Sequence, residues 1–211
     1  MKIISLHFPK AGGSSLRSQF HQLLQDKLLL DYDHHPLGPN AAHTVDELPP
    51  SVRLVHGHFH AARYDQVRDA FRFTFLREPI ENLLSIYYFW ETRPDDGSNP
   101  WHSMFLREKP TVEEFAKKYI PVQRLMSETF FGGYDMSRFD FVGFFENRLI
   151  DIPKLAEMIG VPLDANHHIN RTESGWERRA AVKDDRKLMA RLSTLLADDL
   201  SFFERQRAIR N

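Results

Sequence analysis

The sequence contains no cysteine, which excludes disulfide bonds and thiolate metal sites. It also has no apolar run near the ~18 residues that a membrane-spanning helix requires. An excess of one charge sign is missing too, because 28 Lys and Arg face 29 Asp and Glu, for a formal net charge of −1. A protein that binds a nucleic-acid polymer normally has a broad basic excess, so this class of partner is disfavoured.

These absences also bear on location and size. Without cysteine, a reducing cytoplasm is the natural compartment, and because the first predicted strand begins at residue 2 we expect no signal peptide. A chain of 211 residues that is 42% hydrophobic can bury one substantial core, which predicts a single domain over residues 1–211. No feature of the sequence indicates an oligomeric state.

Apolar strands alternate with amphipathic helices along much of the chain. We predict strands at 2–8, 28–32, 53–56, 71–76 and 139–145, and helices at 14–26, 63–69, 79–92, 111–119, 121–130, 148–159 and most of 177–207. Segments 33–51 and 93–110 are rich in turn residues and predict a long loop and a mobile loop or lid. The alternation predicts an α/β fold with a mostly parallel central sheet flanked by helices, a helical C-terminal part, and ligands at the carboxyl ends of the strands.

The strongest functional signal is the turn between the first strand and the first helix, where Pro9 to Leu16 read PKAGGSSL. Two glycines let the backbone turn tightly, and N–H groups at a helix start favour a phosphate. Ser14 or Ser15 is expected to cap the helix, and Lys10 adds a positive charge. The lysine precedes both glycines, whereas the nucleotide-triphosphate loop GxxxxGK[ST] places it after the last one. A simple tight connection is the alternative.

A second strand-to-helix turn carries Arg77, Pro79 and, eight residues after the arginine, Ser85. Proline suits the first helical turn, where a missing N–H costs nothing. Apolar residues from Ile80 to Tyr88 fall at helical spacing and predict a buried stripe with Ser85 beside it. Taken singly, the arginine would be a surface ion pair and the serine a hydroxyl on the helix flank.

Three histidines alternate in the segment between these turns: His56, His58 and His60. Alternation in a strand puts side chains on one face, where zinc could bind two or three imidazoles. The metallohydrolase pattern HxHxDH is not completed, however, and Gly57 suggests that the strand ends here. A packed, hydrogen-bonded structural histidine is another open interpretation, and we predict no metal.

Together the three segments resemble the sulfotransferases that use 3′-phosphoadenosine 5′-phosphosulfate (PAPS). PKAGGSSL resembles the family's 5′-phosphosulfate loop, and Arg77 with Ser85 resembles its 3′-phosphate motif. His-Gly-His-Phe at 56–59 is similar to the segment that carries the catalytic base in the polysaccharide 2-O-sulfotransferase branch and its bacterial relatives. The resemblance implies a P-loop-like fold. Because animal members are anchored in the Golgi, an unanchored chain looks more like a bacterial member.

The resemblance also implies residue roles. His58 is the expected catalytic base, His56 shares that role or orients the substrate, and Lys10 stabilises charge on the departing 5′-phosphate. The expected donor-binding residues are Lys10, Ala11, Gly12, Gly13, Ser14, Ser15, Arg77 and Ser85, with Arg171 and Thr172 in a later loop. Arg107 and Arg124 fall where relatives place groups that meet the acceptor.

The implied reaction is in-line transfer of a sulfuryl group from PAPS to the hydroxyl of a glycan or small molecule, with 3′-phosphoadenosine 5′-phosphate (PAP) as product and no metal. A P-loop-type kinase or nucleotide hydrolase is an alternative, disfavoured by the position of Lys10 and by the lack of an obvious apolar strand ending in a magnesium-binding aspartate. A histidine metalloenzyme is another. A catalytically inactive nucleotide-binding relative is disfavoured by the presence of Lys10 and His58. The sequence does not identify the acceptor.

Overall fold

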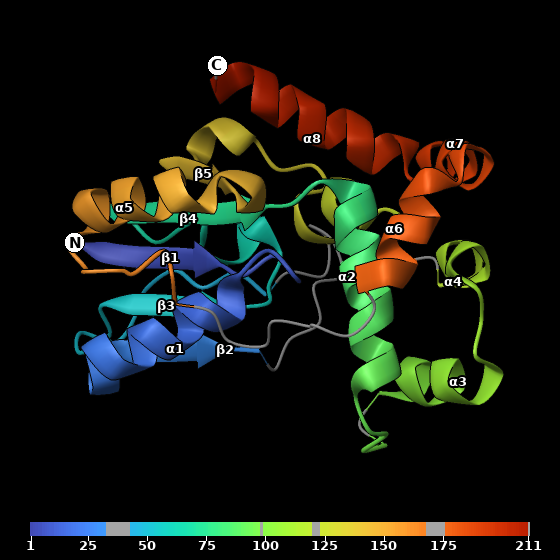
Figure 1. The fold of residues 1–211 in the computed structure, drawn as a ribbon. Coiled ribbons are helices and arrows are strands. Elements are labelled where there is room, and N and C mark those ends of the chain that lie inside the picture. Colours follow the sequence, from blue (N-terminus) through green and yellow to red (C-terminus); the bar gives the residue numbers. More distant parts are fainter. Residues whose placement is uncertain (33–42, 98, 120–122, 168–175, 211) are drawn as a thin grey trace. The chain divides into compact units, whose positions relative to one another are not determined.

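The computed structural model describes residues 1–32, 43–97, 99–119, 123–167 and 176–210. They form two compact units. The first unit comprises Met1–Arg77 and Met126–Asn170 and holds the sheet, whereas the second comprises Glu78–Leu125 and Arg171–Asn211 and is helical (Figure 1). The single domain predicted for residues 1–211 stays a prediction.

A five-stranded parallel sheet organises the first unit (Figure 1). Its strands are β1 (Lys2–Leu6), β2 (Leu28–Asp31), β3 (Leu54–Gly57), β4 (Ala70–Leu76) and β5 (Phe141–Phe144), in the spatial order β2-β3-β1-β4-β5. The register pairs Leu6 with Gly57 on one side and with Thr74 on the other, so the carboxyl ends of the central strands share one edge. The predicted α/β fold with a parallel sheet is confirmed.

Strand β1 lies where the strand order reverses, because the chain passes from one side of β1 to the other between β3 and β4. In open parallel sheets, ligands bind in the crevice outside the carboxyl ends of the strands at such a reversal. The loop that follows β1 therefore occupies the place in this fold where a ligand is expected.

Helices α1 (Gly13–Leu24) and α5 (Arg148–Ile159) pack against β2 and β5 in the first unit. Its shorter helical segments are Gln25–Lys27, Ala61–Tyr64, Leu125–Phe130, Met136–Arg138 and Phe145–Asn147, and the first residue of Leu125–Phe130 belongs to the second unit. The helix predicted at 63–69 is wrong. A short 3₁₀ helix forms instead, and the His60 side chain accepts a hydrogen bond from Ala62 N–H at its start.

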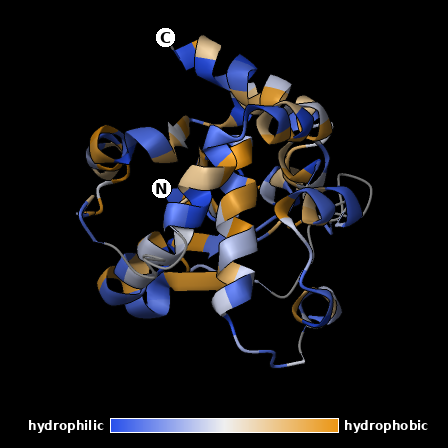
Figure 2. Ribbon diagram, turned by 45° about the vertical axis from the view of Figure 1, so that its right-hand side comes forward, coloured by the Kyte–Doolittle hydropathy of each residue, from blue (hydrophilic) through white to orange (hydrophobic). Residues whose placement is uncertain are grey.

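The second unit contains α2 (Pro79–Thr92), α3 (Pro100–Glu108), α4 (Val112–Lys118), α6 (Trp176–Asp184), α7 (Arg186–Leu195) and α8 (Ala197–Arg210). One apolar cluster joins α2, α3, α4 and α7 through residues such as Leu84, Phe105, Phe115 and Leu192. Figure 2 shows the matching pattern, with helices striped in hydrophobic and hydrophilic colours. Among the described residues, no helix has the length and apolar character needed to cross a membrane.

Helix α3 occupies part of the segment predicted as a loop or lid at 93–110, so that prediction is wrong there. The Asn99 side chain accepts hydrogen bonds from the N–H groups of Trp101 at 3.0 Å and His102 at 3.4 Å, and Pro100 occupies the first turn. Asparagine followed by proline is a helix-start signal. Because Pro, Asp and Gly residues precede this helix start, the sequence pattern predicted a loop instead.

A Cβ atom on Gly57, at the end of β3, would lie 1.7 Å from the carbonyl oxygen of Asp31. Gly57→Ala is therefore expected to lower the free energy of unfolding by about 3 kcal/mol, because two paired backbones must separate. At Gly97 a Cβ would meet nothing within 4 Å, and Gly97→Ala is expected to cost about 1 kcal/mol through its positive φ. Urea unfolding measures both, and equal losses would contradict the steric explanation.

Candidate functional site

The candidate site is built around the loop that joins β1 to α1. Gly12 is the N-cap of α1 with a φ of 90°, a left-handed conformation that favours glycine, and Lys10 has a φ of 59°. The Gly12 carbonyl oxygen accepts hydrogen bonds from the N–H groups of Ser15 at 3.1 Å and Leu16 at 3.3 Å. No side chain caps this helix, so the predicted capping by Ser14 or Ser15 is wrong.

This turn leaves backbone donors at the start of α1. Within the part of the chain that the structure describes, the N–H groups of Gly12, Gly13 and Ser14 have no acceptor. Unsatisfied N–H groups and the helix dipole together favour an anion at this position. Ala11 was also predicted to bind the sulfuryl donor, but its N–H group donates to the Phe8 carbonyl oxygen at 3.4 Å.

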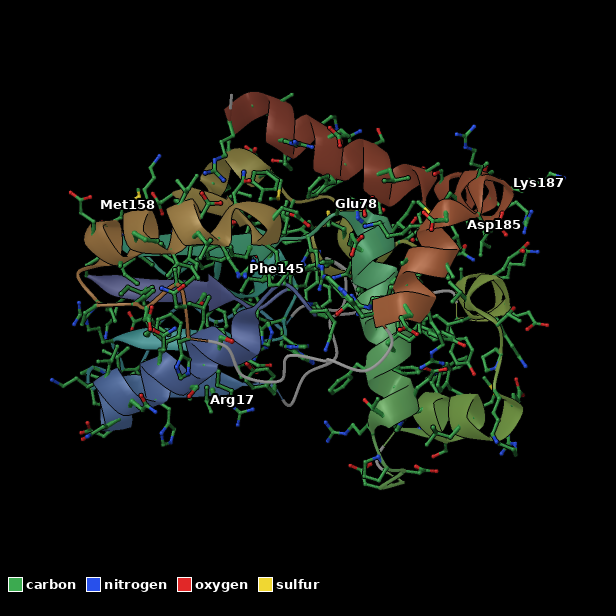
Figure 3. All side chains as sticks on the ribbon, viewed as in Figure 1. Arg17, Glu78, Phe145, Met158, Asp185 and Lys187 are labelled. Atoms are coloured by element: carbon green, nitrogen blue, oxygen red, sulfur yellow. The ribbon has the colours of Figure 1, made fainter. Side chains whose placement is uncertain are left out.

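Arg77, directly after β4, reaches this loop. Its Nη1 donates to the Lys10 carbonyl oxygen at 3.0 Å, and its guanidinium carbon lies 4.4 Å from the centroid of the Phe145 ring. Phe145 follows β5 (Figure 3), and the guanidinium of Arg148 lies 5.2 Å from the same ring centroid. The opening turn and the strand-end arginine, separate in the sequence, thus meet at the carboxyl ends of β1 and β4.

A cavity opens beside the loop within the first unit. It is small and open to solvent, and it is lined by Ala11, Gly12, Ser15, Leu16, Phe75, Phe145, Arg148, Ile152, Ala165 and His167. It therefore combines a helix start, an aromatic ring and a guanidinium. Sequence reasoning missed Phe145 and Arg148, since only the order of elements in that region was familiar.

His56, in β3, is fully buried. Its Nε2 donates to the Gly13 carbonyl oxygen at 3.2 Å, so its Nδ1 accepts the hydrogen of the Ser5 hydroxyl at 2.7 Å. Burial lowers its pKa to about 3, although the backbone hydrogen bond acts in the opposite direction. Because both ring nitrogens are bonded within the protein, the predicted role of His56 as a base or substrate contact does not fit. It ties β3 to β1 and to α1.

His58 is partly exposed and follows β3. Its Nε2 lies 3.2 Å from Nδ1 of His7, and its ring centroid lies 4.9 Å from that of Tyr32. Burial, and to a smaller extent the charge of Arg17, lowers the pKa of His58 to about 4. The imidazole is therefore neutral at pH 7, which is the protonation state that a general base requires.

His60 has a structural set of partners. Its Nδ1 accepts from Ala62 N–H at 3.2 Å, and its Nε2 donates to the Gly132 carbonyl oxygen at 3.1 Å. The three alternating histidines thus have separate partners rather than a common one. Among the described residues, no group of three or more His, Cys, Asp or Glu side chains could hold a metal ion.

His7 is a residue of this site that the sequence pattern does not reveal, because it falls inside the predicted strand 2–8. Its Nδ1 lies 2.8 Å from the Tyr32 hydroxyl oxygen, and its ring stacks on His56 with centroids 5.0 Å apart. Burial is the main cause that lowers the pKa of His7 well below its ordinary value. His7 and His58 therefore form a neutral pair.

Strand β2 is apolar and ends in an aspartate, Asp31. This strand end was not recognised when the sequence disfavoured a kinase. Asp31 Oδ2 accepts hydrogen bonds from Arg63 Nε at 2.6 Å and from the Tyr64 hydroxyl at 2.7 Å, and the residue is buried. This carboxylate anchors the segment after β3. Its partners do not favour a magnesium-binding role.

Three predicted site residues lie in the second unit. Ser85 is buried on α2, and Arg107 is exposed on α3. Arg124 Nε lies 3.1 Å from a carboxylate oxygen of Asp198, and both side chains are about half exposed. Arg171 and Thr172 lie outside the described residues.

No protein-family model and no curated protein matches this chain. Among solved structures, the fold is similar to that of a mouse sulfotransferase, SULT7A1, complexed with PAP, with a TM-score of 0.39 and 12% identity over 77% of this chain and 60% of that one. This chain thus spans less than two thirds of the mouse structure. A sulfotransferase from Alicyclobacillus acidocaldarius has a TM-score of 0.42 and 16% identity over 96% of this chain and 98% of that one.

The buried histidines predict acid sensitivity. Because the pKa of His56 is about 3 in the folded protein and about 6.5 when unfolded, the unfolded state binds the proton more readily. Its contribution to stability is complete above about pH 6.5 and falls by about 1.4 kcal/mol per pH unit toward pH 3. His56 alone should lower the free energy of unfolding in urea by about 2 kcal/mol between pH 7 and pH 5, and the depressed pKa of His58 adds a loss in the same direction. Exposed His21→Asn should leave this difference intact, and equal stability at the two pH values would contradict it.

Proposed function

We propose that this protein is a PAPS-dependent sulfotransferase, which transfers the sulfuryl group of PAPS to an acceptor hydroxyl and releases PAP. The observation that carries the proposal is the hydrogen bond from Arg77 to the Lys10 carbonyl oxygen, at 3.0 Å. A nucleotide with phosphates at two positions requires two anion-binding groups close together. The loop after β1 and the arginine after β4 supply such a pair.

The donor is proposed to bind at the loop. The N–H groups of Gly12, Gly13 and Ser14 hold the 5′-phosphate, and Lys10 neutralises charge that develops on it. Arg77 holds the 3′-phosphate by charge-assisted hydrogen bonds. From the family motifs, we also propose that five further residues contact PAPS: Ala11, Ser15, Ser85, Arg171 and Thr172.

The cavity beside the loop supports the same assignment. Its lining places the Arg148 guanidinium, 5.2 Å from the Phe145 ring centroid, beside the residues at the start of α1. The cavity borders Gly12, so the cationic Arg148 in its lining lies in the same pocket as the start of α1, where the 5′-phosphate is proposed to bind.

The proposed reaction is an in-line displacement at sulfur. The acceptor oxygen forms a bond to sulfur while the bond from sulfur to the 5′-phosphate oxygen breaks, and PAP leaves with that electron pair. His58 takes the proton of the acceptor hydroxyl, a role typically worth about 10²–10⁴ in rate. Positioned N–H donors stabilise the charge that grows on the leaving phosphate, each contributing on the order of 10². The scheme requires no metal.

Fewer residues are proposed to bind the acceptor than to bind PAPS. We propose a carbohydrate or another small hydroxyl compound, with Arg107 and Arg124 as acceptor contacts, and a cytoplasmic protein of the bacterial type. A screen of glycan, lipid and phenolic acceptors with radiolabelled PAPS identifies the substrate class.

His58→Ala should reduce turnover by about 10²–10⁴ and leave PAP affinity within about twofold, because the side chain acts on the acceptor proton rather than on the nucleotide. Initial rates and calorimetric titration with PAP measure the two effects. Exposed His21→Ala serves as the control. Loss of PAP binding in step with activity would argue against a catalytic base.

Arg77→Ala should weaken PAP binding by about 10-fold or more, since charged hydrogen bonds contribute about 1.5–3 kcal/mol. Binding of adenosine 5′-phosphate, which lacks the 3′-phosphate, should fall less, because only the bond from Arg77 to the Lys10 carbonyl oxygen is then lost. Exposed Arg68→Ala, at the other end of β4, is the matched control. Equal losses for both nucleotides would contradict the assignment, and tighter binding of ATP than of PAP would favour a kinase.

A further inference from the structure

The ring of His58 is held by a second histidine. His7 follows β1, Tyr32 follows β2 and His58 follows β3, so the three side chains come from the carboxyl ends of three adjacent strands. His7 Nδ1 lies 3.2 Å from His58 Nε2 and 2.8 Å from the Tyr32 hydroxyl oxygen. His7 is 8% exposed.

We propose, building on the proposed function, that His7 is the positioning residue of His58 and fixes its tautomer with the hydrogen on Nε2. A neutral imidazole has one N–H and one lone pair. If His7 Nδ1 donated to His58 Nε2, the hydrogen of His58 would sit on Nδ1 and its lone pair would be occupied. With His7 as the acceptor, His58 Nδ1 keeps the lone pair that takes the proton of the acceptor hydroxyl.

Tyr32 determines which of these arrangements forms. Among the described residues, the only hydrogen-bond partner of its hydroxyl is His7 Nδ1. The hydroxyl can donate or accept, and donation to His7 Nδ1 is the arrangement that gives its hydrogen an acceptor among the described residues. His7 Nδ1 is then an acceptor, and His58 Nε2 carries the hydrogen. The two donors share one lone pair, which fits the longer 3.2 Å contact.

The His7 ring is itself closely confined. It stacks on His56 with an interplanar angle of 17°, and a Cβ atom on Gly13 would lie 1.8 Å from its Cδ2. His56 is in turn fixed by Ser5 and by the Gly13 carbonyl oxygen. A side chain held in this way can orient its partner precisely enough for catalysis. Glycine at position 13 therefore makes room for His7 as well as for the turn.

The arrangement has a consequence for the reaction. When His58 takes a proton on Nδ1 it becomes an imidazolium, and its Nε2–H bond to His7 becomes charge-assisted and stronger. His7 thus acts on His58 as the aspartate acts on histidine in the Ser-His-Asp triad, with a neutral acceptor in place of a carboxylate. The proton stays on His58.

The direct test is the ¹⁵N spectrum of the histidine rings at pH 7 without nucleotide, which distinguishes Nε2–H from Nδ1–H tautomers and is independent of activity. We expect His58 as the Nε2–H tautomer in the wild type and a shift toward Nδ1–H in His7→Phe. His7→Asn, which keeps an acceptor oxygen near the Nδ1 position, should retain the wild-type tautomer. His60→Asn, at a buried histidine whose ring nitrogens bond to Ala62 and Gly132, is the control.

The kinetic readout separates positioning from nucleotide binding. In sulfuryl transfer, His7→Phe should lower kcat by about 10–100-fold with PAP affinity unchanged, and His7→Asn should recover most of it. If His7→Phe does not fold, Tyr32→Phe removes the donor to His7 and should raise the Nδ1–H population of His58. Tyr134→Phe, which removes a hydroxyl bonded to Asp65, is its control.

An Nδ1–H tautomer of His58 in the wild type would overturn the proposal, and so would a His58 tautomer unchanged in both His7→Phe and Tyr32→Phe. Loss of PAP binding in His7→Phe would also overturn it, because His7 would then belong to the nucleotide site. The expected tautomers without any sulfuryl transfer would support the His7 to His58 bond and count against the proposed function alone.

Discussion

The hydrogen bond from the Arg77 guanidinium to the Lys10 carbonyl oxygen is the interaction on which the candidate site depends. It joins the loops that follow two neighbouring parallel strands and lies at the point where the strand order of the sheet reverses. Lys10 has a positive φ, so its carbonyl is held in an unusual direction, and Arg77 secures it there. This bond brings a cationic side chain and the start of α1 together in one place.

Around this junction, burial separates the histidines by role. His56 and His60 have both ring nitrogens bonded within the protein and hold strands and loops together. His58 has one nitrogen engaged by His7, and its ring is partly exposed. The same low-polarity surroundings that keep these imidazoles neutral at pH 7 also make the folded state sensitive to acid.

The sequence predicts well whatever depends on neighbouring residues. Helix α2 forms at the predicted residues 79–92, because Glu78 and Pro79 start it and apolar spacing buries one face. Helix α3 was not predicted, because its start at Asn99 and Pro100 lies among turn residues. The predicted roles of His56 and His58 could not be separated from sequence, because Ser5, Gly13 and His7 approach them only when β1 and β3 pair. Phe145 and Arg148 likewise join the site through the β4 and β5 pairing.

The most direct test of the account is a crystal structure of the protein with PAP. We expect the 5′-phosphate on the N–H groups of Gly12, Gly13 and Ser14, and the 3′-phosphate within hydrogen-bonding distance of Arg77. A nucleotide bound elsewhere, or one whose 3′-phosphate points away from Arg77, would contradict the claim that the two loops form a single donor site.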